Sequence, residues 1–182
     1  RLPLEQQTGT DLIYYNETYK SFIMIQYKAM EKYGDEAIFR FPNKQLSEEI
    51  DRMDSVLDAL KKISTDKIPD NYRINNNPFF LKFCAREVLE PDNCGLIPGM
   101  YVPLEFWKQL EAGDTLEGPR GGKYISYENI GRYMDNTEFS HLVSKAWVGT
   151  SIEQSQQLEI IIKDIIENGK SAMLAIKTDK KI

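Results

Sequence analysis

Apolar residues follow two different periods along this chain, one typical of strands and one typical of helices. Residues 10–28 hold two apolar, aromatic-rich runs separated by Asn16-Glu17-Thr18, a composition that favours a β-hairpin. From position 45 apolar side chains recur every three or four residues, which predicts an amphipathic helix over 45–62. Its apolar positions are Leu46, Ile50, Met53, Leu57 and Leu60, and the acidic residues expected on its outer face are Glu48, Glu49, Asp51, Asp54 and Asp58.

Further along the chain, strands and helices alternate. The apolar run 79–88 predicts a central strand, whereas residues 29–44 are expected to form a loop with one short strand at 37–41. The other expected elements are a strand at 101–102, helices from Pro103 to Leu110 and over 127–133, 137–147 and 151–168, and a final strand at 172–176. This order favours one α/β domain over residues 1–182, a mixed β-sheet flanked by helices.

Composition narrows the possible classes of protein. The chain of 182 residues is 41% hydrophobic and 28% charged, as in a folded globular protein. No apolar run approaches the roughly 20 residues that span a bilayer, so we expect no membrane segment. The two cysteines, ten residues apart with no C-x-x-C pair, favour a reducing, cytoplasmic location. Two cysteines and one histidine exclude a disulfide scaffold and a metal site built from His and Cys.

Two features of the sequence, its net charge and the positions of its tryptophans, indicate whether the chain could bind nucleic acid. The net charge of −5 argues against it, but the acidic excess is concentrated in residues 46–70, mostly within the predicted helix. Trp107 and Trp147 stand among apolar helical positions, where tryptophan is more often a core residue than a platform for stacked bases. We therefore expect both side chains in the core.

The candidate chemistry lies in the hairpin. Side chains alternate across a strand, so Gln26 and Lys28 share one face at the end of an otherwise apolar run. A buried ammonium group requires an anion close by. Asp11 begins the partner strand, and a turn at 16–18 would pair it roughly with residues 23–25. The three side chains are therefore expected to converge.

Such a cluster suits metal-assisted hydrolysis of phosphodiester bonds. Mg²⁺, like Mn²⁺, prefers oxygen ligands, and these would be the Asp11 carboxylate, the Gln26 side-chain carbonyl and the Tyr27 backbone carbonyl. Lys28 would position or help to deprotonate the attacking water and neutralise charge on the phosphate. The open alternative is an ordinary amphipathic hairpin whose Gln26 and Lys28 reach solvent.

The segments Gly9-Thr10-Asp11-Leu12 and Ile25-Gln26-Tyr27-Lys28 resemble the D…QxK variant of the PD-(D/E)XK nuclease superfamily, as in Mrr-type restriction nucleases and the nuclease effectors of bacterial anti-phage systems. The resemblance implies a restriction-endonuclease-like core and Mg²⁺-dependent cleavage of DNA in antiviral defence. It assigns Asp11 to the metal, Gln26 to the usual Glu position and Lys28 to catalysis. It also implies that the domain works within a larger protein or assembly.

Two parts of the family pattern are open in this chain. The helix that follows the motif commonly adds a polar residue, for which Gln45 and Glu49 are both candidates. A helix before the Asp strand commonly carries a Glu that completes the metal site. Only ten residues precede Asp11, and Glu5 is the sole acid among them, so we expect either Glu5 in this role or a helix upstream of Arg1 in a longer chain.

Basic residues around the motif are the expected contacts to DNA. Those flanking it are Lys20, Lys32, Arg40 and Lys44, and Lys82 and Arg86 share a face of the predicted central strand. The alternative function is a nuclease-like domain without activity that binds another protein. The acidic face of the helix at 45–62 would then be its docking surface.

Overall fold

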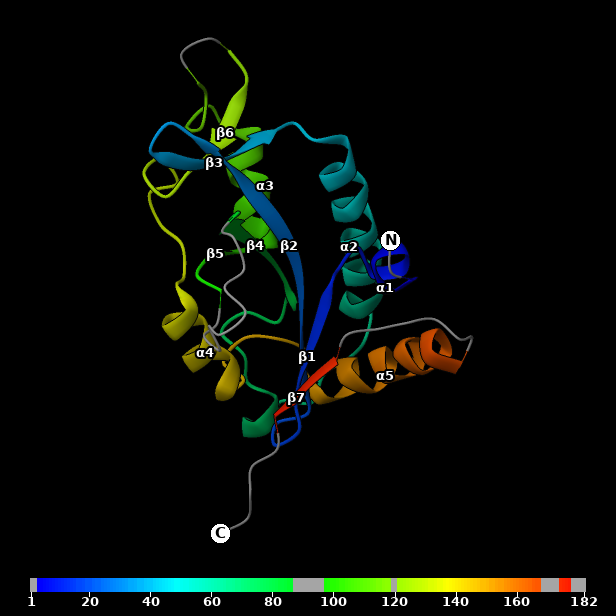
Figure 1. Cartoon of the computed structure of the whole chain (residues 1–182). Helices are drawn as coiled ribbons and strands as arrows, with labels where there is room; N and C mark the ends of the chain where they lie inside the picture. Colours follow the sequence, from blue (N-terminus) through cyan, green and yellow to red (C-terminus); the bar gives the residue numbers. More distant parts are fainter. Residues whose placement is uncertain (1–2, 87–96, 119–120, 168–173, 178–182) are drawn as a thin grey trace, which may run out of the picture.

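The computed structural model describes residues 3–86, 97–118, 121–167 and 174–177 (Figure 1). The strands are β1 (Leu12–Asn16), β2 (Ser21–Tyr33), β3 (Glu36–Phe41), β4 (Phe79–Ala85), β5 (Met100–Pro103), β6 (Lys123–Ile125) and β7 (Leu174–Lys177). The helices are α1 (Pro3–Thr8), α2 (Lys44–Lys61), α3 (Leu104–Ala112), α4 (Asn136–Ser144) and α5 (Ile152–Glu167), with a 3₁₀ turn, η1, at Pro69–Asn71. The strands form a mixed sheet in the order β5-β4-β2-β1-β7, from which β3 and β6 extend beside β2. The expected α/β class, a mixed sheet flanked by helices, is confirmed.

The predicted hairpin is present, but its turn is longer than expected. β1 and β2 are antiparallel, with Leu12 opposite Ile25 and Asn16 opposite Ser21. Four residues, 17–20, connect them, instead of a turn at 16–18. Asp11 therefore lies level with Gln26, and its expected pairing with residues 23–25 was wrong.

β2 continues well beyond the predicted strand. Its end pairs with β3 around a turn at Gly34, so the expected loop was wrong for residues 29–33, although the short strand at 37–41 is confirmed within β3. Figure 1 shows this hairpin reaching away from the rest of the sheet. Polar residues 31–33 are exposed there, which explains why no apolar alternation marked the strand.

α2 connects the β2–β3 hairpin to η1 and β4. It is the predicted amphipathic helix, and the side chain of Asn43 begins it by accepting a hydrogen bond from the Leu46 N–H at 3.0 Å. β4 is the predicted central strand and runs parallel to β2, with Gln26 opposite Leu81. The chain thus places α2 across the strand that carries Gln26 and Lys28.

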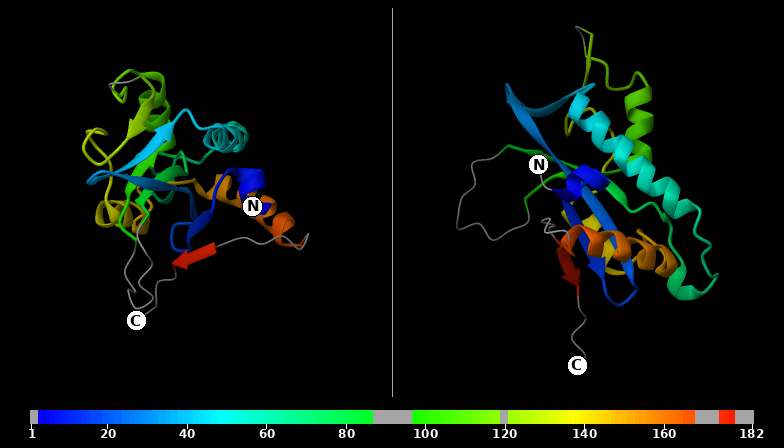
Figure 2. Two further views of the ribbon diagram at one scale, coloured as in Figure 1. Left: turned by 45° about the horizontal axis from the view of Figure 1, so that its top comes forward. Right: turned by 90° about the vertical axis from the view of Figure 1, so that its right-hand side faces the viewer.

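Helices cover both faces of the sheet (Figure 2). α2, α3 and α5 pack on the face that holds Phe22 and Met24, and α4 packs on the opposite face with Ile23 and Ile25. Glu49 of α2 is fully buried, so its expected place on the acidic outer face was wrong.

Several smaller expectations also changed. A short helix, α1, precedes Asp11 within the chain. The helix expected over 127–133 is absent: residues 127–130 form a turn and a bend, and residues 131–133 are irregular, with Gly131 at a φ of +77°. Trp107 is fully buried as expected, whereas Trp147 is 44% exposed and therefore no core residue.

Residues 87–88 of the predicted central strand and residues 172–173 of the last strand lie outside the described ranges. Within those ranges, no helix is both long and apolar enough to cross a membrane.

Candidate functional site

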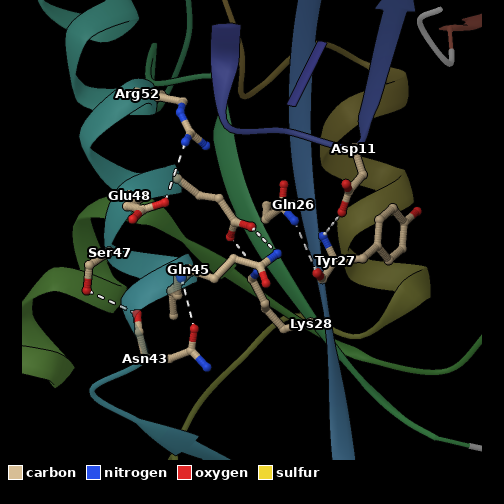
Figure 3. A network of polar contacts seen from close by, with 11 residues as sticks. Asp11, Gln26, Tyr27, Lys28, Asn43, Gln45, Ser47, Glu48 and Arg52 are labelled. Carbon is tan, nitrogen blue, oxygen red and sulfur yellow. Dashed lines mark hydrogen bonds and ion pairs between the residues drawn. The ribbon is translucent and has the colours of Figure 1, made fainter. Parts of the chain in front are cut away.

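Gln26 and Lys28 point from β2 toward α2 (Figure 3). They continue the face that begins with Phe22 and Met24, because alternate side chains of a strand share a face. Both are buried, with 2% and 7% of their surface exposed. The alternative in which these two side chains reach solvent is therefore wrong.

The anion beside Lys28 is Glu49 of α2, so the expectation that Asp11 would be its partner was wrong. Glu49 was one of the two candidates for the polar residue that the following helix adds to the motif. The Lys28 ammonium forms an ion pair with the Glu49 carboxylate. Gln45, one turn earlier in α2, donates a hydrogen bond from Nε2 to Glu49 Oε1 at 2.9 Å. Gln45 and Glu49 thus both face the motif: Glu49 contacts Lys28 directly, and Gln45 holds the Glu49 carboxylate in place.

Asp11 lies just before the first residue of β1 and continues the hydrogen bonds between β1 and β2. Its N–H donates to the Ile25 carbonyl at 2.9 Å, and its Oδ2 accepts the N–H of Tyr27 at 2.9 Å. Gln26 Nε2 donates to the carbonyl of the same Tyr27 at 3.3 Å. The side chains of Asp11 and Gln26 therefore meet on the two backbone groups of Tyr27, as Figure 3 shows.

Gln26 leaves one buried acceptor unused. Among the residues that the structure describes, none donates a hydrogen bond to Gln26 Oε1. A buried polar atom without a partner carries a desolvation cost of about 1–3 kcal/mol, so this oxygen is suited to an added donor or cation.

The oxygen ligands at this position fit Mg²⁺ or Mn²⁺ in type. Asp11 and Glu49 offer carboxylates, and Gln26 Oε1 is an unused buried acceptor. The Tyr27 carbonyl accepts the Gln26 amide and would have to release it to bind a metal. The described residues contain no cluster of three or more His, Cys, Asp or Glu side chains, so at most two carboxylates are at hand. Glu5 lies within α1, but its side chain is outside what is described.

Three of the four expected DNA contacts lie around the β2–β3 hairpin and the start of α2, and the fourth, Lys20, lies at the other end of β2. Lys32 and Arg40 line a hollow of about 210 Å³ at the β2–β3 hairpin, where Arg40 lies 5.0 Å from the centre of the Tyr33 ring. Lys44 is exposed at the start of α2. Lys20 lies in the β1–β2 loop, eight residues from Lys28, or about 26 Å along a strand that rises ~3.3 Å per residue. The structure therefore places Lys20 away from the cluster.

Lys82 lies on the other face of the sheet and is no surface contact. It is buried, and its Nζ donates to the Ile97 carbonyl at 2.7 Å. The rings of Tyr101 and Tyr27 lie 4.6 Å and 5.6 Å from that nitrogen. Burial lowers the pKa of Lys82, and the nearby Cys84 partly opposes this shift. Arg86 is exposed beyond the end of β4.

Two features of the site were missed in the sequence. Glu49 stands between Leu46 and Met53 in the apolar stripe of α2, three residues from one and four from the other, and this spacing could have revealed its burial. Gly9, with a φ of +72°, brings the chain so close to α2 that a Cβ would lie 2.2 Å from the Glu49 carbonyl oxygen. Glycine at this position permits α1 to pack beside Glu49.

Comparison with protein families, with curated proteins and with solved structures finds no match to this chain.

Proposed function

We propose that this chain is a metal-dependent endonuclease domain that hydrolyses DNA at the cluster of Asp11, Gln26 and Lys28. The observation that supports this most is the meeting of Asp11 and Gln26 on Tyr27. The unused buried Gln26 Oε1 and the buried Lys28–Glu49 pair add to it. Following the resemblance of the motif, the domain would serve in bacterial antiviral defence, within a larger assembly.

Charge supports cation binding at this position. Lys28 and Glu49 neutralise each other, and Asp11 adds one negative charge, so the three groups carry a net charge of −1. Hard oxygen atoms around a net negative charge favour a divalent cation. Asp11, Gln26 and Glu49 would hold the metal, which when bound supplies Lewis-acid polarisation of the phosphate and a more acidic water.

The remaining chemistry belongs to Lys28. Its ammonium group is held in place by Glu49 and by its packing between β2 and α2. A phosphate at the cluster would compete with Glu49 for this charge, and the Nζ would then stabilise negative charge that develops in the transition state. Lys32 and Arg40 on the β2–β3 hairpin would hold the DNA backbone further along the same strand.

Plasmid cleavage tests this proposal. Wild-type protein with Mg²⁺ or Mn²⁺ is expected to nick or linearise supercoiled DNA, and EDTA is expected to stop it. Asp11→Asn should reduce the rate by at least about 100-fold, a typical cost of losing one transition-state contact. So should Lys28→Met/Glu49→Leu, which removes both members of the buried pair and so leaves no unpaired charge. Lys108→Ala is the matched control, because Lys108 pairs with Asp54 on the surface. Cleavage that persists in both site variants would contradict the assignment.

A second function is favoured by another observation. Asp11 holds a backbone N–H and Glu49 neutralises Lys28, so both charged groups of the motif have structural partners. This arrangement suits a nuclease-like domain without activity that binds another protein. Its acidic docking face on α2 is partly neutralised, because Glu48 lies beside Lys44 and Arg52. Absence of both cleavage and Mg²⁺ binding would favour this second function.

A further inference from the structure

An aromatic and basic hollow lies beside the β1–β2 loop, at the opposite end of β2 from the residues that pair with β3. Its volume is about 630 Å³, and it is lined by Tyr19, Pro69, Tyr72, Arg73, Lys145 and Trp147. Three of these side chains are aromatic and two are cationic. Within the described part of the chain, the lining includes no carboxylate.

The rings of this hollow are unusually open to solvent. Tyr72 is 62% exposed and Trp147 is 44% exposed, and their ring centres lie 6.1 Å apart at an angle of 85°. The backbones beneath them are tied together, because the Ile74 N–H donates to the Trp147 carbonyl at 2.7 Å. Large aromatic side chains held open in this way are typical of binding surfaces.

Arg73 fixes a positive charge in the wall of the hollow. Its guanidinium donates to the carbonyls of Tyr19 and Thr150 at 3.1 Å, and to those of Asp70 and Tyr72 at 2.8 Å. These bonds join the β1–β2 loop, η1 with the residue that follows it, and the segment just before α5. The cation is thus held rigidly, while Lys145 is exposed at the end of α4.

We propose that this hollow binds single-stranded nucleic acid, with bases stacked on Tyr72 and Trp147 and the backbone beside Lys145. Aromatic faces next to cations suit this ligand, because every base can stack and every nucleotide carries a negative phosphate. Lys20, exposed in the same loop as Tyr19, adds a further cation nearby. A neutral proline-rich peptide also binds aromatic grooves, but it has no negative charge to pair with Arg73 and Lys145.

The identity of the bound strand rests on the proposed nuclease function. Ser21 begins β2 beside this loop, and it lies seven residues from Lys28, or about 23 Å along the strand. At ~3.4 Å per stacked nucleotide, this distance corresponds to roughly seven nucleotides. A single-stranded segment of the substrate would therefore be held here while the cluster of Asp11, Gln26 and Lys28 acts on DNA further along.

Binding is measured without cleavage, by fluorescence anisotropy of labelled dT12 in EDTA at low salt. Tyr72→Ala and Trp147→Ala are expected to weaken binding roughly tenfold, the usual effect of losing one stacking side chain. Tyr133→Ala is the matched control, since Tyr133 forms a similar exposed pair with Tyr127, with ring centres 5.7 Å apart. Lys145→Gln should lower the slope of log affinity against log salt by about 0.7.

Tryptophan emission gives an independent measurement. Trp147 is exposed and Trp107 is buried, so dT12 should quench the emission of wild-type protein and leave that of Trp147→Ala unchanged. No binding of dT12, an equal loss in Tyr133→Ala, or quenching by a proline-rich peptide alone would overturn the inference. Binding of dT12 without plasmid cleavage supports this surface and removes the nuclease proposal. Cleavage without binding in EDTA removes only this surface.

Discussion

The ammonium group of Lys28 in β2 is paired with the carboxylate of Glu49 in α2, and both groups are shielded from water. The Lys28 side chain is 8% exposed and the Glu49 side chain is fully buried. Removing two charges from water is costly, so each of these groups needs the other. The pair therefore ties the strand that carries the motif to the helix that crosses it.

Breaking this pair should destabilise the fold strongly. Lys28→Met leaves Glu49 as a buried charge without its ammonium partner, and we expect a loss of about 3–5 kcal/mol in the free energy of unfolding. The exposed pair of Lys108 and Asp54 is the control, where Lys108→Met should cost about 0–1 kcal/mol. Urea denaturation measures both. The double variant Lys28→Met/Glu49→Leu should recover much of the loss, and equal effects at Lys28 and Lys108 would show that the buried pair has no special role.

Asp11 can be tested for a structural role and a catalytic role separately. Asp11→Asn keeps an oxygen to accept the Tyr27 N–H, so stability should change by less than about 1 kcal/mol. Asp11→Ala removes that acceptor and should cost about 1–3 kcal/mol. Thermal unfolding measures stability, and the plasmid assay measures cleavage. If Asp11 also binds the metal, both variants lose cleavage, whereas full activity in Asp11→Asn would leave only the structural role.

Gln26→Glu should increase the response of the protein to divalent cations. The new carboxylate would be buried where Gln26 is now only 2% exposed, so the variant should be less stable than wild type in EDTA. Mg²⁺ should restore much of this stability, because a ligand that binds only the folded state stabilises it by RT ln(1 + [L]/Kd). Thermal unfolding with and without Mg²⁺ measures the effect.

The matched control is Gln109→Glu, which makes the same charge change at an exposed position of α3. Its melting temperature should respond to Mg²⁺ as wild type does. Equal responses of Gln26→Glu and Gln109→Glu would show that the cluster does not select a cation.

Lys82 should make stability depend on pH in the alkaline range. Its folded-state pKa is lowered by burial below the ordinary value of 10.5, so the unfolded chain binds more protons between these two pKa values. Stability therefore rises with pH across that window. The raised pKa values of Tyr27 and Tyr101, also caused mainly by burial, act in the opposite direction above pH 10.

The Lys82 contribution is isolated by comparing wild type with Lys82→Met, in which both tyrosines remain. Urea denaturation from pH 7 to pH 10.5 should show wild type gaining stability relative to the variant as pH rises. A constant difference between the two proteins would mean that burial does not disfavour the charged form of Lys82.

Local patterns alone determined much of the fold. The apolar period of α2 and the aromatic runs of β1 and β2 each lie within one short stretch of chain, so the sequence was sufficient to predict these elements. The shared face of Gln26 and Lys28 also follows from the alternation of one strand. The polar end of β2 was missed because that segment extends beyond the core and has no apolar face to mark it.

Tertiary structure decided which faces and edges meet. Periodicity assigns residues to a side of an element, but it does not identify the element packed against that side. Glu49, not Asp11, therefore became the partner of Lys28 once α2 crossed β2, while Asp11 remained at the strand edge on the N–H of Tyr27. In the same way, Trp107 and Trp147 have similar apolar neighbours in sequence. Only the packing of α3 on the sheet buried one of them, while the chain after α4 left the other in solvent.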